Sequence, residues 1–112
     1  MVNMANRIMT KEIEKRFTKY PLYSQGGKGE EATVVLKVFN PYGVGTWLIT
    51  EGQKEENGDW LFFGYIHIHE WEWGYCTLSQ LEGAGANFYG YRMPLEREKY
   101  ESNGKYKVKD LI

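Results

Sequence analysis

Two histidines, His67 and His69, mark the part of the chain where residue types and spacing could support chemistry. They are separated by one residue, so on a β-strand both imidazoles would point to the same side and could share a metal ion. Two histidines and a carboxylate are the minimum for a catalytic zinc or iron site, and Glu70 and Glu72 lie nearby. If the strand continues, however, the glutamates have the opposite parity, and the sequence contains no third histidine. We therefore expect no metal site and no cofactor, and we interpret the histidines as partly exposed side chains at a strand end.

Other catalytic arrangements use carboxylates or the single cysteine. Glu51, Asp59, Glu70 and Glu72 could divide acid and base roles, but all four fall at predicted hairpin ends, where we expect solvated carboxylates. Cys76 would need a neighbour that stabilises its thiolate in order to act as a nucleophile. A lone cysteine forms neither an internal disulfide nor a structural zinc site. We expect a small buried hydrophobe at Cys76 and a protein that is not an enzyme.

Trp71 and Trp73 lie among the same glutamates. Alternation puts both indoles on one side of a strand, and large aromatic residues dominate cores and interfaces alike. As core residues they would close the sheet against an N-terminal helix. As interface residues they would anchor a partner inside an acidic rim. We favour the core role for Trp73 and the interface role for Trp71. The predicted partner-binding residues are His67, His69, Glu70, Trp71, Glu72 and Trp73.

A predicted β-hairpin must position these side chains. Its first strand spans 59–68, where alternation divides the side chains between two sides. One side carries Trp60, Phe62, Ile66 and Ile68. The other side carries Leu61, Phe63, Tyr65, His67 and His69. Because both sides are apolar at first, we expect a central strand that is covered on each face.

The second half of the hairpin ends at a helix start. Residues 70–72 form the predicted tip, and residues 73–78 form the returning strand. Ser79 and Glu82 match a capping box, with Ser79 at the cap, so a short helix or a single turn begins there.

The remaining C-terminal residues contain a break, a strand and a charged tail. Residues 83–86 are rich in glycine and alanine and predict a flexible break. Residues 87–95 favour a fifth strand at the sheet edge, because Pro94 cannot donate to a central ladder. For the tail from Glu96 onward three forms stay open: a frayed hairpin, a helix followed by a short strand, or disorder.

The N-terminal part of the chain predicts one amphipathic helix, over 10–20. Its apolar positions recur at a spacing of four and are Met9, Ile13 and Phe17. Thr10 can cap the first free amides, and Pro21 stops the helix. The Gly-rich connector 24–31 lacks the Gly-Lys-Ser/Thr ending of a phosphate loop, so we interpret it as a linker.

Two further strands precede the hairpin. The first spans 32–40, and its alternation places Val34, Leu36 and Val38 on one side. The second spans 45–51, and a turn at Asn57-Gly58 joins it to the next strand.

Together these elements predict an α+β fold. We expect an antiparallel meander of four or five strands, with the N-terminal helix packed on one face and a short helix after the fourth strand. At 112 residues the chain fits a single domain, 1–112, with residues 1–8 and about 97–112 flexible. It contains neither the run of ~20 apolar residues that a membrane span needs nor an N-terminal signal peptide. We therefore expect a cytoplasmic protein.

The net charge of -1 conceals an uneven layout. Residues 1–29 carry six Lys/Arg and two Glu, residues 30–82 carry two Lys and nine Asp/Glu, and residues 83–112 carry six Lys/Arg and four acidic residues. An acidic centre disfavours a nucleic-acid groove on the sheet, because phosphate contacts need Lys and Arg. It suits a partner with a basic surface.

Three segments carry a resemblance to a known family: FNPYGVGTWLITEG (39–52), DWLFFGYIHIHEWEWGY (59–75) and TLSQLE (77–82). They resemble uncharacterised bacterial proteins that are met on plasmids, phages and conjugative elements, the domain-of-unknown-function family 2958. With the helix start TKEI (10–13), the likeness covers about two-thirds of the chain. It implies an α+β fold and a context of mobile genetic elements, and it supplies no catalytic residues. Members usually carry acidic or small residues in place of the histidine pair, which weakens the idea of a family active site there.

We accordingly expect a non-enzymatic accessory protein of a mobile genetic element that acts by protein–protein binding. An inhibitor of a host defence or nucleic-acid-processing protein, of the anti-CRISPR or anti-restriction type, fits this description. The expected partner is a host- or element-encoded protein with a basic surface, not a membrane. One alternative is a small metal-dependent hydrolase that uses His67 and His69. Another is a single-stranded nucleic-acid binder that uses Tyr100, Lys105, Tyr106, Lys107 and Lys109.

Overall fold

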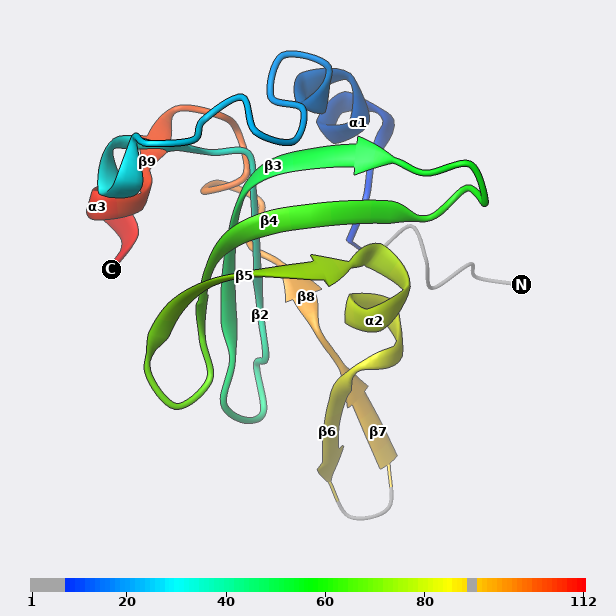
Figure 1. Cartoon of the computed structure of the whole chain (residues 1–112). Helices are drawn as coiled ribbons and strands as arrows, with labels where there is room; N and C mark the ends of the chain where they lie inside the picture. Colours follow the sequence, from blue (N-terminus) through cyan, green and yellow to red (C-terminus); the bar gives the residue numbers. More distant parts are fainter. Residues whose placement is uncertain (1–7, 89–90) are drawn as a thin grey trace.

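A computed structural model describes the backbone of residues 8–88 and 91–112, and the side chains of residues 8–85 and 93–112. It has the predicted α+β class, with a five-stranded antiparallel sheet, an N-terminal helix and a short helix after the β5 strand (Figure 1). None of the helices in these residues is long and apolar enough to cross a membrane. In chain order the elements are α1 Lys11–Phe17, the 3-10 turn η2 Gly29–Glu31, β1 Thr33–Val34, β2 Leu36–Phe39, β3 Thr46–Lys54, β4 Trp60–His67, β5 Trp71–Thr77, α2 Leu78–Gly83, β6 Gly85–Phe88, β7 Tyr91–Pro94, β8 Glu96–Arg97, β9 Tyr106–Lys107 and α3 Val108–Leu111.

The main sheet has the strand order β5-β4-β3-β2-β8, so β3 is central and β5 and β8 are the edges. Its neighbouring strands are all antiparallel. Figure 1 shows that the sheet is strongly curved, with α1 and α3 at opposite ends of it. The strand that carries the predicted site, β4, is internal as expected. The turn at Gly58, where φ is +88°, joins it to β3 as predicted.

A β-bulge helps to bend the sheet beneath the predicted site. The pairing of β3 with β4 shifts register between Ile49 and Glu51, and a bulge increases local twist and bending. Gly64 of β4 lies opposite, where a Cβ atom would stand 2.2 Å from the Leu48 carbonyl oxygen. Only a glycine fits this close approach of two backbones.

The main hydrophobic cluster lies between the sheet and α1. Phe17 of α1 packs against Trp60 and Phe62 of β4, with ring centroids 5.6 and 5.4 Å apart. Thr10 caps α1 as predicted, since its hydroxyl accepts the N–H of Ile13 at 3.2 Å. The helix ends at Phe17, earlier than predicted. The chain then turns so that the carbonyl of Tyr20 can accept the N–H of Gly52 in β3 at 3.0 Å.

A second, smaller cluster corrects the strand predicted over 32–40. The chain bends at Val35, so this stretch forms two strands, and β1 leaves the main sheet to pair with β9. Val34 therefore packs with Leu48 and Val108 in the second cluster, whereas Leu36 and Val38 belong to the main one. The predicted common side for the three residues was wrong because alternation does not continue through a bend.

The hairpin tip and the following helix start also differ from expectation. The tip lies at 68–70, so Trp71 and Glu72 are already in β5. The cap of α2 is Thr77, whose hydroxyl accepts the N–H of Gln80 at 3.2 Å and whose N–H donates to the Gln80 side chain at 2.9 Å. Ser79 was the wrong cap because two overlapping sequences match the motif. The hydroxyl of Ser79 instead binds the carboxylate of Asp59 at 2.7 Å.

The fifth strand of the sheet is β8, not the stretch 87–95 that the sequence favoured. The described part of that stretch contributes to a separate hairpin, β6–β7, which projects from the sheet in Figure 1, and residues 89–90 lie outside the described residues. After Pro94 the chain buries Leu95 in the main cluster, and Arg97 then pairs with Val38. The predicted break at 83–86 is in part regular structure, since Gly85 begins β6.

The charged tail takes neither of the two ordered forms left open by the sequence. It runs from β8 through a loop to β9 and ends in α3. The loop is attached to the core through the buried Ser102, whose hydroxyl accepts the N–H of Lys37 at 2.8 Å and whose carbonyl accepts from Arg16 at 2.9 Å. The single domain and the flexibility of residues 97–112 stay predictions, and residues 1–7 lie outside the described residues.

Candidate functional site

The candidate site is an aromatic surface on the face of the β4–β5 hairpin that points away from α1. Three cross-strand pairs build it: Phe63 with Tyr75, Tyr65 with Trp73, and His67 with Trp71. Successive ring centroids lie 4.7–5.6 Å apart, so the rings form one continuous zigzag. Aromatic pairs at such distances stabilise a sheet by about 0.5–1.5 kcal/mol each. We call this set the aromatic surface: Phe63, Tyr65, His67, Trp71, Trp73 and Tyr75.

The aromatic surface is anchored at one end and open at the other. Trp71 and Tyr65 pack against the second hydrophobic cluster and are half-buried. Trp73 is 39% exposed and Tyr75 is 54% exposed. Neither tryptophan closes the sheet against α1, and the burial of the two is the reverse of the predicted division between core and interface. The expectation that β4 is covered on both faces was also wrong, because its side chains on this face are only partly buried.

A strained tyrosine lies beside the open end. Tyr23 has a φ of +72°, which is unfavourable for a bulky side chain, and it is 78% exposed. Its backbone is held by Glu51, whose two carboxylate oxygens accept the N–H groups of Tyr23 at 2.7 Å and Gln25 at 2.9 Å. Glu51 is only 3% exposed, so the prediction of a solvated carboxylate was wrong for this residue. The two main-chain donors replace the water that burial removes.

The Gly-rich connector is fixed to the sheet by Gln25. The buried amide of Gln25 donates to the carbonyls of Thr33 at 2.8 Å and Thr50 at 2.7 Å, and accepts the N–H of Thr33 at 2.8 Å. Between the connector and the sheet lies a shallow groove of about 370 Å³, with Phe63 and Trp73 in its lining. The connector, predicted to be a linker, therefore borders the aromatic surface.

The pKa of the Tyr75 phenol is affected by these neighbours. Loss of hydration raises the pKa of Tyr75 above its ordinary value of 10.0, and the neighbouring Tyr23 phenol and the Glu51 charge act in the same direction. Tyr75 is consequently a neutral hydroxyl at physiological pH, able to donate or accept a hydrogen bond.

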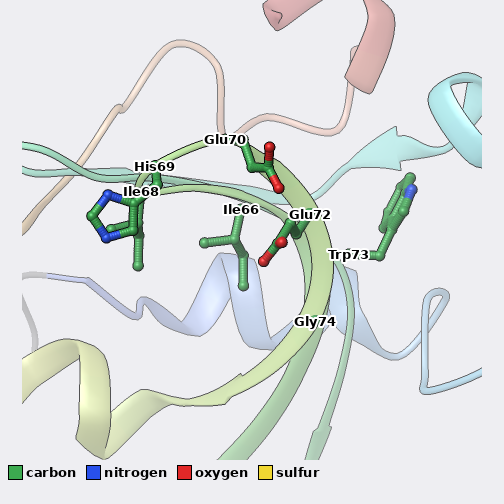
Figure 2. A pocket seen from close by; sticks show the side chains of 7 residues that line it. All are labelled: Ile66, Ile68, His69, Glu70, Glu72, Trp73 and Gly74. Atoms are coloured by element: carbon green, nitrogen blue, oxygen red, sulfur yellow. The ribbon is translucent and has the colours of Figure 1, made fainter.

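A second hollow, which we call the tip pocket, lies at the tip of the hairpin and has a volume of about 540 Å³. Figure 2 shows Ile66, Ile68 and His69 gathered near Glu72, while the ring of Trp73 points away from them. The tip pocket is thus lined mainly from the side opposite the aromatic surface. The six predicted partner-binding residues are therefore divided. Trp71, Trp73 and His67 belong to the aromatic surface, whereas His69, Glu70 and Glu72 line the tip pocket, to which Trp73 also contributes.

The histidine pair is separated by the same division. His67 is the last residue of β4 and stacks on Trp71 with a centroid distance of 5.0 Å, whereas His69 lies in the turn and lines the tip pocket. The predicted common side was wrong because strand alternation ends at His67. Across the described residues, no group of three or more His, Cys, Asp or Glu side chains could hold a metal ion.

The remaining candidates for chemistry have structural surroundings. Asp59 accepts hydrogen bonds from the Ser79 side chain and from the N–H groups of Ser79 and Trp60, and the first of these bonds does most to lower the pKa of its carboxyl. Burial raises the pKa of the Cys76 thiol to about 12, so the thiolate is scarce at neutral pH. Glu70 is exposed in the tip and Glu72 is exposed in β5, so both carboxylates are solvated as predicted.

The sequence analysis missed Tyr23, Gln25 and Glu51 as neighbours of the site. No local motif links a loop residue to a carboxylate more than twenty positions away. The contact of Glu51 with Tyr23 and Gln25 therefore could not be predicted from the sequence. By contrast, the alternation over 63–67 and 71–75 was sufficient to find the aromatic surface. The aromatic surface was overlooked because the predicted tip, 70–72, lies two residues after the observed one, so Trp71 was assigned to the tip and not to the returning strand.

Fold and site together define a small α+β sheet protein with an open aromatic surface on one hairpin. A family model matches residues 8–104, and the chain belongs to that family, DUF2958, whose description is "protein of unknown function". No curated protein matches the chain significantly. No solved structure does so either.

Proposed function

We propose that the protein acts by binding a protein partner through the aromatic surface and the acidic hairpin tip. The observation that carries this proposal is the open end of the aromatic surface, where Trp73 and Tyr75 are exposed on a regularly paired strand. Tryptophan and tyrosine are enriched among the residues that contribute most to binding energy in protein interfaces.

Charge supports a partner with a basic surface. Glu70 is exposed in the tip and Glu72 in β5, both on the side of the hairpin opposite the aromatic surface. The central segment 30–82 carries most of the acidic residues of the chain. Complementary charges steer association and exclude unsuitable partners. The same charges would repel the phosphates of a nucleic acid stacked on the rings.

The biological context belongs to this proposal as well. We place the protein among cytoplasmic accessory proteins of mobile genetic elements, with a host defence or nucleic-acid-processing protein as the partner that it inhibits. The support is the resemblance of the three segments 39–52, 59–75 and 77–82 to proteins met on such elements.

The alternative of a nucleic-acid binder has weaker support. Lys107 and Lys109 of the basic tail both contact Glu31, at 3.1 and 2.6 Å, so part of the tail charge is already neutralised within the chain. The hydrolase alternative would need a third ligand beside two histidines that lie in different surroundings.

The test is capture of partners by the tagged full-length chain from a lysate of host cells, with and without nuclease. Three baits are compared: the unchanged chain, Trp73→Ser, and the double variant Glu70→Lys/Glu72→Lys. We expect one nuclease-resistant protein to be recovered near stoichiometry with the unchanged chain and to be strongly reduced with both variants.

Two matched controls separate the site from general effects. Tyr100→Ser removes an aromatic ring that is as exposed as Tyr23 but lies beyond β8, and Glu55→Lys/Glu56→Lys makes the same charge change in the β3–β4 turn. Both controls should capture the partner normally. Recovery of nuclease-sensitive material alone, or equal recovery with Trp73→Ser, would contradict the proposed function.

A further inference from the structure

The outer edge of β5 is open. β5 is the last strand of the main sheet, and no strand of the described residues pairs with its other side. Its seven residues span roughly 23 Å at the usual rise of a strand, and its pairing with β4 runs without a bulge from Thr77 to Trp71. Proteins usually protect an edge with Lys, Pro, a bulge or a short strand. β5 has none of these, and its single charged residue is Glu72.

Hydrogen bonds elsewhere in the sheet fix the direction of the β5 main chain. In β3, Gly52 donates its N–H to the carbonyl of Tyr20 at 3.0 Å, and the carbonyl of Ile49 accepts the N–H of Val35 at 2.9 Å. The N–H and C=O of one strand residue point to the same side. Gly52 and Ile49 therefore direct their main-chain groups away from β4.

The strand register then fixes the direction of the main-chain groups in β4 and β5. Phe62 and Gly64 lie opposite Gly52 and Ile49, so their main-chain groups face β5 and bond to its residues Cys76 and Gly74. The alternate residues of β5 must then direct their N–H and C=O groups outward. These outward-facing residues are Trp71, Trp73 and Tyr75.

The end of the edge agrees with this assignment. Thr77 has the same parity as the outward-facing residues, and its N–H is bound by the side chain of Gln80 at 2.9 Å rather than by β4. The capping box of α2 thereby closes the edge at Thr77. The open stretch coincides with the three residues of β5 that belong to the aromatic surface.

Both sides of this edge suit a cation. On one side are the exposed rings of Trp73 and Tyr75, and an ammonium or guanidinium group binds the face of an indole best. On the other side Glu72 is exposed and Gly74 leaves room, since a Cβ atom there would meet only the side chain of Ile66, at 3.8 Å. A strand laid along β5 could contact both with neighbouring Lys and Arg residues.

A second copy of the chain fits this edge less well. β5 contains Glu72 and no Lys or Arg, so two β5 strands that pair about Gly74 would bring two carboxylates to one face without a cation. A charge that points across an edge opposes self-pairing, and the same charge attracts a basic strand.

We propose that the open edge of β5 binds an extended basic segment of the partner as an added strand, with cationic side chains placed on Trp73 and beside Glu72. This inference rests on the proposed function and specifies its mode: main-chain hydrogen bonds supply affinity, and alternate side chains supply specificity.

The test titrates the full-length protein, labelled with ¹⁵N, with the blocked peptide acetyl-Val-Arg-Lys-Val-Arg-Lys-Val-amide. Adjacent Arg and Lys residues present a cation to each side of the edge. Two control peptides are used: one has Glu in place of every Arg and Lys, and the other carries N-methyl groups on two adjacent central residues, which blocks strand pairing and keeps the charge. We expect the basic peptide to slow hydrogen exchange at Trp71, Trp73 and Tyr75, and both controls to bind at least about tenfold more weakly.

Three results would overturn the inference. Equal affinity for the N-methylated peptide would mean that side chains bind without strand addition. Equal affinity for the acidic peptide would remove the selection for cations. Exchange protection of the same amides that depends on protein concentration alone would mean that a second copy occupies the edge.

A pair of variants separates this inference from the proposed function. Tyr75→Ala removes the ring, and Tyr75→Pro removes the ring together with the outward N–H. Proline is tolerated where an edge N–H faces solvent, so both variants should fold. We expect Tyr75→Pro to bind the peptide and any captured partner at least about fivefold more weakly than Tyr75→Ala does. If Trp73→Ser abolishes partner capture while the two Tyr75 variants behave alike, the proposed function stands and strand addition fails.

Discussion

Both faces of the β4–β5 hairpin carry aromatic rings in close contact, but they differ in what covers them. On the α1 side, Trp60 and Phe62 are buried against Phe17. On the other side, Phe63 and Trp73 stack just as closely, yet Trp73 remains partly exposed. Ring contacts within a sheet thus do not distinguish core from surface. The difference lies in whether a helix is placed over the rings.

The comparison also explains why the open face keeps its order without a cover. Its rings are fixed by direct cross-strand pairs and by the half-buried Trp71, which is packed on the second cluster. A surface that is already ordered loses little conformational entropy on binding. The open face is therefore suited to recognition in a way that a mobile loop is not.

Removal of one ring from each face should give the largest difference in the free energy of unfolding. Phe62→Ala leaves a cavity in the main cluster and should reduce the free energy of unfolding by about 3–5 kcal/mol. Trp73→Ala loses two ring contacts at a partly exposed site and should cost about 1–2 kcal/mol. Urea unfolding of both variants measures the difference. Equal losses would show that the aromatic surface is as much a core as the α1 side.

Proline substitutions in β5 compare the loss of an N–H that faces β4 with the loss of one that faces outward. Gly74→Pro removes an N–H that bonds to β4, whereas Tyr75→Pro removes one that faces outward. We expect Gly74→Pro to be less stable than Tyr75→Pro by about 1–3 kcal/mol, because it leaves a ladder acceptor without its donor. Thermal unfolding measures this. The reverse order would refute the assignment of outward-facing residues.

The loop beside the open face should respond to its buried carboxylate. Glu51→Gln places an amide nitrogen against a main-chain donor and should destabilise the protein by about 1–2 kcal/mol. It should also raise the hydrogen-exchange rate of the Tyr23 and Gln25 amides. The exposed Glu55→Gln serves as the control and should change neither quantity.

The smallest expected effect is a pH dependence at the start of β4. The pKa of Asp59 is lowered in the folded state, so the unfolded state binds the proton more tightly. The stability that Asp59 contributes is therefore present above its ordinary pKa of 3.8 and is lost as the pH falls through the lower folded value. Asp59→Asn should reduce stability at pH 7 and flatten the acid limb of a urea-unfolding series. An unchanged acid limb would argue against this linkage.

Much of the fold could be predicted from local patterns. The cap at Thr10, the Asn57-Gly58 turn and the alternation from Trp60 to Phe62 follow short-range rules, and all of them are confirmed. The bend at Val35 was not predictable in this way, because the run of β-branched and apolar residues is typical of one continuous strand and only the pairing of β1 with β9 reveals the break.

The candidate site was predictable in its residue types and not in its arrangement. The stretch 67–73 was rightly identified as exposed at its tip, but its side chains were assigned to a single site. The structure divides them between two faces, because β4 ends before His69 and because Glu72 alternates with Trp71 and Trp73 in β5. Where a strand stops decides the direction of every later side chain, and sequence patterns locate ends poorly.

The reactivity of the single cysteine can be used to measure opening of the hairpin. Cys76 is a residue of β5 whose side chain is buried in the main cluster, and its thiol is almost entirely protonated in the folded state. An alkylating reagent therefore reacts readily there only when the packing around β5 opens or the whole chain unfolds. The alkylation rate of Cys76 in the unmodified protein therefore measures how often β5 opens. A strand bound along β5 should lower this rate, and no engineered probe is needed to detect it.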